Sequence, residues 1–144
     1  MNVRRGDLVY PELSYEIVGI LYDVYNEIGY NHKEKIIQKA IEVLLKKRGY
    51  SYEKELRVDI EIEGEKVGYY SLDFLIENKV VLETKRKDKF DKCDFDQVKK
   101  YLKTKNRKLG ILANFTNRGM IYQRVLKPVK WNKWFVEFVA IRYS

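Results

Sequence analysis

The chain has 144 residues, a formal net charge of +8 and an apolar fraction of 45%, which predict one compact domain with a sizeable core. A single cysteine, Cys93, excludes an intrachain disulfide framework and an all-cysteine zinc or iron–sulfur site within one chain. No signal peptide or membrane span is predicted, since no window approaches about 20 apolar residues. We therefore expect a cytoplasmic protein.

Two helices are predicted at the start of the chain. Apolar residues recur at helical spacing over residues 14–28, with Ser14 as the N-cap and Gly29 as the stop. A second apolar stripe over residues 36–45 predicts a helix that Gly49 ends. The chain thus opens with two amphipathic helices joined by a short connection.

The hydrophobic period then changes from that of a helix to that of a strand. Residues 56–62 alternate between apolar and charged, and the turn at residues 63–66 leads into a strand over residues 69–76. A polar turn at residues 77–79 separates this strand from the next, at residues 80–85. Three strands joined by two hairpins are therefore predicted.

The second hairpin brings two carboxylates together. A three-residue turn sets Asp73 directly opposite Glu83, and strand alternation places Lys85 on the face of Glu83. Like charges directly opposite each other are destabilising unless something neutralises them, as a divalent cation would. A two-residue turn would instead set Asp73 opposite Thr84.

The second half of the chain predicts a crossover between parallel strands. A helix is expected at residues 94–105, followed by a strand at residues 109–115 that is buried on both faces. A right-handed crossover makes this strand parallel to that of Glu83. Another strand is expected at residues 120–126, and residues 134–143 form a last strand or a packing arm.

These elements predict a mixed-sheet α/β fold with flanking helices. We expect a single domain over residues 1–144, with a core at about 13–126 and an extension at 127–144.

The positive charge is concentrated in one stretch. Residues 85–108 contain eleven Lys or Arg against four Asp, so they carry +7 of the total charge. Clustered cations attract phosphate backbones through counterion release, although a solvated helix face has the same composition. Because the stretch begins at Lys85, beside the paired carboxylates, the nucleic-acid interpretation is favoured.

Three further polar residues are candidates for the same site. Glu34 lies in the first turn of the second helix, while Gln97 and Tyr101 are four residues apart on one face of the third. Each also has an ordinary explanation: a carboxylate near a helix start, a glutamine on a helix surface and a tyrosine at the margin of the core.

The combination resembles the PD-(D/E)XK nuclease superfamily, and within it the GxxExxY group. The resemblance rests on Glu34, Asp73, Glu83-Thr84-Lys85, the Gln-x-x-x-Tyr pair Gln97 and Tyr101, and the strand that follows them, Lys108-Leu109-Gly110-Ile111-Leu112-Ala113-Asn114-Phe115. It spans about residues 13–126. The Gly and Tyr of the group name are replaced by Asn31 and Ile37, so the hydroxyl of that tyrosine is absent here, and the segment after Pro128 lies outside the resemblance.

The resemblance implies a restriction-endonuclease-like core and metal-dependent hydrolysis of phosphodiester bonds, with DNA favoured over RNA. Asp73, Glu83 and the backbone carbonyl of Thr84 would bind Mg²⁺, for which Mn²⁺ can substitute. Glu34 would hold a metal-bound water or a second ion. Lys85 would position or deprotonate the attacking water and stabilise the phosphate, with Gln97 orienting it and Tyr101 as the sixth catalytic candidate.

The basic residues around the site would contact the nucleic-acid backbone; these are Arg86, Lys87, Lys89, Lys99, Lys100 and Lys103. A homodimer is one option for the assembly. Two other interpretations stay open: a nucleic-acid-binding or partner-binding domain that keeps the fold without turnover, and a salt-bridge network in which Lys85 neutralises one carboxylate but not both.

Overall fold

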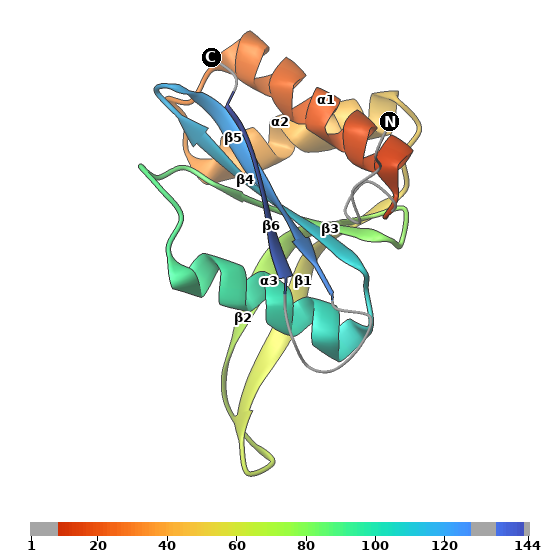
Figure 1. The fold of residues 1–144 in the computed structure, drawn as a ribbon, viewed down its shortest axis with the longest axis vertical. Coiled ribbons are helices and arrows are strands. Elements are labelled where there is room, and N and C mark those ends of the chain that lie inside the picture. Colours follow the sequence, from red (N-terminus) through yellow and green to blue (C-terminus); the bar gives the residue numbers. More distant parts are fainter. Residues whose placement is uncertain (1–8, 128–134, 143–144) are drawn as a thin grey trace.

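The computed structural model describes residues 9–127 and 135–142, and the side chains of the last range are not described (Figure 1). The elements along the chain are α1 (Pro11–Ile28), α2 (Glu34–Lys47), β1 (Tyr52–Ile62), β2 (Glu65–Ile76), β3 (Val80–Lys85), α3 (Lys92–Lys105), β4 (Leu109–Thr116), β5 (Gly119–Leu126) and β6 (Phe135–Arg142). None of the helices in these ranges is long and apolar enough to cross a bilayer.

The six strands form one sheet in which spatial order follows chain order, from β1 to β6. Neighbouring strands are antiparallel except for β3 and β4, which α3 connects as a parallel pair. The predicted crossover is therefore confirmed. Helices α1 and α2 cover one face of the sheet and α3 the other (Figure 1), so the fold is the mixed α/β sandwich that the sequence predicts.

The sheet separates two apolar clusters because alternate side chains of each strand point to opposite faces. On β3, Val80 and Leu82 pack in the cluster beneath α1 and α2, while Val81 packs in the cluster beneath α3. Strand β4 is buried along its whole length, as expected for a strand covered on both faces. The layers on either side thus hold β3 and β4 at the centre of the molecule.

Two helix starts differ from the predictions. Helix α1 begins at Pro11 and not at Ser14, which is buried within the helix, because proline is pre-organised for a first helical position. Helix α3 begins at Lys92 because Asp91 caps it. The Asp91 side chain accepts a hydrogen bond from the Asp94 amide at 3.1 Å, and Asp94 accepts one from the Asp91 amide at 2.9 Å. This reciprocal capping box satisfies two amides at the helix start.

Strand β6 pairs antiparallel with β5. Of the two alternatives for residues 134–143, the strand is therefore the one observed. Trp131 and Trp134 lie outside the described residues.

Candidate active site

The site lies where β2 and β3 separate. Their backbone pairing begins with Ile76 opposite Val80, which confirms the three-residue turn and the register that sets Asp73 opposite Glu83. At this position a side chain takes the place of a backbone acceptor, since the Asp73 amide donates to Glu83 Oε1 at 3.0 Å. The two strands thus open around the carboxylates.

The side chains of β2 switch from one face of the sheet to the other at Asp73. Leu72 packs in the cluster beneath α3, whereas Phe74, two residues later, packs in the cluster beneath α1 and α2. In a regular strand these two side chains would share a face. The neighbouring strand is irregular at the same level, because Glu55 has a φ of 54°. Asp73 therefore lies where the side chains of β2 switch from one face of the sheet to the other, and it can contact residues of both helical layers.

Uncharged donors hold the Asp73 carboxylate. Its Oδ2 accepts hydrogen bonds from the Thr84 amide at 2.8 Å and from Thr84 Oγ1 at 2.5 Å. Its Oδ1 accepts one from Gln38 Nε2 of α2 at 2.9 Å. The sequence analysis missed Gln38; its place one turn after Glu34 on the predicted second helix was the available signal. These bonds fix the carboxylate without supplying a positive charge.

Glu83 and Lys85 point the same way from β3, as predicted. Lys85 Nζ lies 3.2 Å from Glu83 Oε2, and the Glu83 side chain is only 4% exposed. One ammonium therefore neutralises one of the two carboxylates, which leaves Asp73 without an ion-pair partner among the described residues.

Burial raises the pKa values of both carboxyls. For Glu83, burial and then the neighbouring Asp73 charge outweigh the effect of Lys85 and raise its pKa to about 8. Burial also raises the pKa of Asp73, against the hydrogen bonds from Thr84. For Lys85, burial acts to lower the pKa, but the Glu83 carboxylate offsets this and the net pKa is raised. The doubly ionised form of the pair is therefore disfavoured unless a cation compensates its charge.

This donor set fits a divalent cation of the Mg²⁺ type. Such a cation takes hard oxygen ligands, often from one or two carboxylates, and it would compensate the charge that burial makes costly. The described residues contain no group of three or more His, Cys, Asp or Glu arranged to hold a metal. The fit therefore rests on Asp73 and Glu83, with any further ligands from backbone, water or substrate.

The other candidate residues differ in their distance from this centre. Glu34 is exposed at the start of α2, and its charge contributes to the raised pKa of Lys85, so it lies on the same side of the molecule as the ammonium. Gln97 is half-buried on α3, and its backbone carbonyl accepts a hydrogen bond from the Tyr70 hydroxyl at 3.0 Å. Tyr101 is buried in the cluster beneath α3. Its pKa is raised by burial, with smaller effects from Arg107, which follows α3, and from Glu53 at the start of β1.

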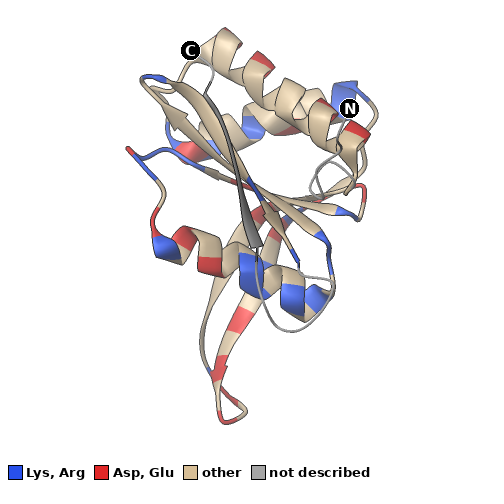
Figure 2. Cartoon of the chain, viewed as in Figure 1, with Lys and Arg blue, Asp and Glu red and all other residues tan. Residues whose placement is uncertain are grey.

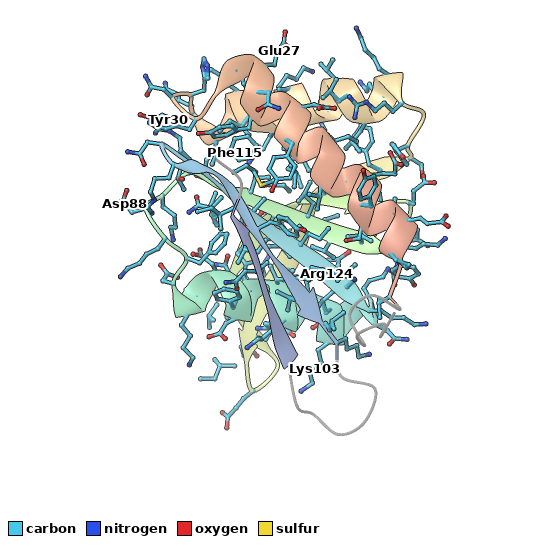
Figure 3. The ribbon with its side chains drawn as sticks, turned by 45° about the horizontal axis from the view of Figure 1, so that its top comes forward. Glu27, Tyr30, Asp88, Lys103, Phe115 and Arg124 are labelled. Atoms are coloured by element: carbon cyan, nitrogen blue, oxygen red, sulfur yellow. The ribbon has the colours of Figure 1, made fainter. Side chains whose placement is uncertain are left out.

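The first two basic residues after Lys85 form hydrogen bonds and ion pairs with other residues of the protein. Arg86 Nε donates to the Tyr30 carbonyl at 2.8 Å, and Figure 3 shows Tyr30 and Asp88 at the same end of the molecule. Lys87 Nζ lies 3.0 Å from Asp91 and 2.9 Å from Asp94, which it joins at the start of α3. Arg86 and Lys87 thus anchor the segment between β3 and α3 to both helical layers.

Asn114 of β4 fixes the backbone of the same segment and was missed by the sequence analysis. Its side chain accepts from the Lys87 amide at 3.0 Å and donates to the Lys87 carbonyl at 2.7 Å. Because Asn114 also lies beside Lys85 in the parallel ladder, it holds the chain directly after the ammonium. The Asn in the buried strand was the available signal, since the rest of that strand is nearly all apolar.

The other predicted nucleic-acid contacts lie on the loop and on α3 (Figure 2). Lys89, Lys100 and Lys103 are exposed, and Lys99 is half-buried. An open hollow of about 690 Å³ borders Asp73 on the other side, and its lining includes Lys35, Gln38, Lys39, Lys54 and Tyr69. The carboxylates therefore have solvent access beside lysines of α2 and β1.

The chain belongs to the PD-(D/E)XK nuclease superfamily, whose sequence profile matches residues 11–125. This agrees with the Asp on β2, the Glu-x-Lys on β3 and the crossover through α3. The match confirms the superfamily and a restriction-endonuclease-like fold; the GxxExxY group stays a prediction.

No curated protein matches the chain. Among solved structures, the chain is similar to one described as "Crystal structure of SSO0001", with 20% identity and a TM-score of 0.49. The similarity covers 84% of this chain and 59% of that protein, so the chain spans less than two thirds of its length.

Proposed function

We propose that this protein is a metal-dependent nuclease that hydrolyses phosphodiester bonds of nucleic acid, with DNA as the favoured substrate. The observation that carries the proposal is the pair formed by the half-buried Asp73 and the buried Glu83, of which Lys85 neutralises only one. A salt-bridge network alone would leave the second carboxylate uncompensated, and an uncompensated buried charge is costly.

Asp73 and Glu83 would hold Mg²⁺ or Mn²⁺, together with the Thr84 carbonyl. When bound, the cation supplies Lewis-acid polarisation of the phosphate and a water of lowered pKa. Thr84 and Gln38 hold Asp73 in one orientation, as second-layer partners of metal ligands do. Glu34, exposed near Lys85, would bind a metal-bound water or a second ion.

Lys85 acts on the phosphate as a cation in this proposal. Because its net pKa is raised, the ammonium stays protonated and donates hydrogen bonds to phosphate oxygens that gain negative charge in the transition state. The role of a base that deprotonates water fits less well. Gln97 would orient Lys85 or the phosphate from α3, and Tyr101 would act on the site only through the packing of that helix.

The superfamily supports a nucleic-acid substrate, and the surface charge supports binding through the phosphate backbone. Lys89, Lys99, Lys100 and Lys103 offer ammonium groups on the loop and on α3. Such contacts position a nucleic acid but do not read its bases. Arg86 and Lys87, which the fold already uses, would contribute to the local positive potential.

A binding domain without turnover is the second candidate function. It is favoured by the hydrogen bonds that engage each oxygen of Asp73 within the protein. Such a domain would bind nucleic acid with the same basic residues and leave it intact.

The test is cleavage of supercoiled, linear and single-stranded DNA, and of RNA, in Mg²⁺ or Mn²⁺. We expect the wild type to cut DNA, and we expect EDTA, Glu83→Ala or Lys85→Ala to reduce the rate by at least about 100-fold. Asp23→Asn is the matched control, because Asp23 forms an ion pair with Arg48 at 2.6 Å outside the site. Retention of DNA without cleavage by the wild type would establish the binding domain instead.

A further inference from the structure

The β1–β2 hairpin extends past α3 (Figure 1) and carries an apolar face that nothing in the described structure covers. Leu56 and Val58 are buried beneath α3, and strand alternation continues their face through Ile60 and Ile62. On this face Ile60 pairs with Gly68 and Ile62 with Glu65, and Ile60 and Ile62 are 37% and 64% exposed. We call residues 59–67 the acidic arm.

The charged groups on the opposite face of the arm pair with other residues of the same hairpin. Arg57 lies 3.0 Å from Asp59, and Lys66 lies 3.6 Å from the same carboxylate. The Arg57 guanidinium stacks over the Tyr69 ring at 3.9 Å. This face needs no partner, so an interaction of the arm would use its apolar face and its tip.

The arm is acidic in a basic protein. It contains Asp59, Glu61, Glu63 and Glu65 against Lys66, for a charge of −3, and the rest of the chain carries +11. Within the described residues, Glu61, Glu63 and Glu65 have no ion-pair partner. Phosphate backbones would be repelled by such a surface, which makes a basic and apolar protein surface its complement.

The outer face of α2 has this complementary chemistry. Ile36 and Val43 are 48% and 42% exposed, and their spacing of seven residues sets them in one row along the helix. Lys35 precedes Ile36, and Lys47 lies one turn after Val43 on the same helix. Neither lysine has an ion-pair partner in the part of the chain that the structure describes. We call Lys35, Ile36, Val43 and Lys47 the α2 stripe.

The arm cannot reach the α2 stripe of its own molecule. Asp73 contacts Gln38 of α2, and the turn at Gly64 lies nine residues before Asp73, or about 30 Å away at about 3.3 Å per residue. In Figure 1 the hairpin tip and α2 lie at opposite ends of the molecule. The two complementary surfaces can meet only between two molecules.

We propose that the acidic arm of one protomer docks on the α2 stripe of a second copy of this chain, and that the reciprocal contact closes a twofold dimer. Ile60 and Ile62 would pack on Ile36 and Val43, with Glu63 and Glu65 of the arm near Lys35 and Lys47. Reciprocal contact of two different patches is compatible with twofold symmetry. Direct contact between two arms is disfavoured, because each carries −3.

Pairing through the free edge of β1 is also disfavoured. Its residues from Glu53 to Arg57 are charged except for Leu56, and the positive φ of Glu55 interrupts the edge. Charged side chains and irregular backbone both protect sheet edges from pairing. The arm and the α2 stripe are therefore the surfaces that favour self-association.

Sedimentation velocity of the full chain over a range of concentrations tests the dimer without nucleic acid or metal, so its result is independent of the proposed nuclease activity. We expect a dimer for the wild type. The arm variant Glu61→Lys/Glu63→Lys/Glu65→Lys and the stripe variant Lys35→Glu/Lys47→Glu should each weaken dimerisation at least about tenfold. The control Glu12→Lys, on an exposed position of α1, should remain dimeric.

A mixture of the two variants gives the sharper result. In the mixed dimer each arm meets a stripe of opposite charge, so we expect a 1:1 mixture to restore the dimer. Ile62→Ser, at an exposed position, supplies a variant whose folding is not at risk. A wild type that is monomeric at every concentration, a dimer that neither charge variant nor Ile62→Ser weakens, or a mixture that stays monomeric would each overturn the proposal.

Discussion

Thr84 contributes two of the three hydrogen bonds that hold the Asp73 carboxylate, one from its amide and one from its hydroxyl. The amide is fixed by the backbone of β3, so the hydroxyl is the part that mutation can remove. At the residue scale, the orientation of the candidate metal ligand therefore depends on a side chain that need not touch the metal itself.

Thr84→Val keeps the shape of the side chain and removes its hydroxyl. We expect Mn²⁺ affinity, measured by calorimetric titration, to fall about 10- to 100-fold, and stability to urea to fall by about 1–3 kcal/mol, since a buried acceptor loses its donor. Thr84→Ser keeps the hydroxyl and should retain most of the affinity. Equal affinities for the Val and Ser variants would contradict this role of the hydroxyl.

The buried carboxylate of Glu42 serves stability. Its oxygens lie 2.7 Å from the Tyr52 hydroxyl and 3.2 Å from Lys54 Nζ. The Tyr52 hydrogen bond and, after the opposing effect of burial, Lys54 lower the Glu42 pKa to about 2. A carboxyl with a lowered folded-state pKa stabilises the protein above its unfolded-state pKa, and this stability is lost as the pH falls toward the folded value.

We therefore expect Glu42→Gln to lower stability by about 1–3 kcal/mol at neutral pH and to have little effect near pH 2. The difference from wild type should shrink between about pH 4.5 and pH 2, as measured by urea unfolding at a series of pH values. Glu27→Gln, at an exposed position, is the control and should run parallel to the wild type. A difference that is constant with pH would assign the loss to packing alone.

At the scale of elements, the contact between α3 and β4 fixes the helix over the site. A Cβ added to Gly110 would lie 2.5 Å from Val98 Cγ1, and the branched valine cannot move away without shifting the helix. The absence of a side chain at Gly110 thus sets how closely α3, with Gln97 and the capping residues, approaches the sheet.

Gly110→Ala should destabilise the protein by about 1–3 kcal/mol, because overpacking a well-packed interface forces the helix outward. Val98→Ala should also destabilise it, through a cavity. Since the second change removes the atom that the first one meets, we expect the double variant to lose less stability than the sum of the two. Additive losses in a chemical-denaturation cycle would show that the helix adapts elsewhere.

The sequence was sufficient for the elements that depend on local periodicity and on short turns. The register of Asp73 and Glu83 was predicted correctly because a three-residue turn fixes it, and the parallel pair because crossovers are right-handed. Gln38 and Asn114 were missed because their partners, Asp73 and the Lys87 backbone, are 35 and 27 residues away. No local pattern records such contacts.

Two other features were not predicted, for a related reason. They are the face of the sheet to which the β2 side chains point and the contacts that Arg86 and Lys87 make within the fold. Alternation assumes a regular strand, and the change at Asp73 accompanies an irregularity at Glu55 on the neighbouring strand. The charge of Arg86 and Lys87 suggested contact with nucleic acid. Their hydrogen bonds to Tyr30 and to the α3 capping residues depend on the tertiary arrangement.

At the scale of the whole molecule, charge is divided between a basic body and an acidic arm (Figure 2). If Lys100 and Lys103 of α3 contact phosphates, Lys100→Gln/Lys103→Gln should weaken DNA binding and reduce the slope of log affinity against log salt by up to about 2. Fluorescence anisotropy at several salt concentrations measures this. Lys79→Gln, in the turn at the other end of β3 from Lys85, is the control, and an equal change there would indicate a general charge effect.

The sheet whose spatial order follows chain order also bears on how the protein folds. Each strand pairs with the strand next to it in sequence, so most loops that must close are short and cost little entropy. The α3 crossover is the longest closure within the described β1–β5 segment, and proteins rich in such local pairings fold quickly. Asp73 and Glu83 belong to strands joined by three residues. The two carboxylates can therefore come together with a hairpin early in folding, and the later docking of α2 and α3 buries a geometry that already exists.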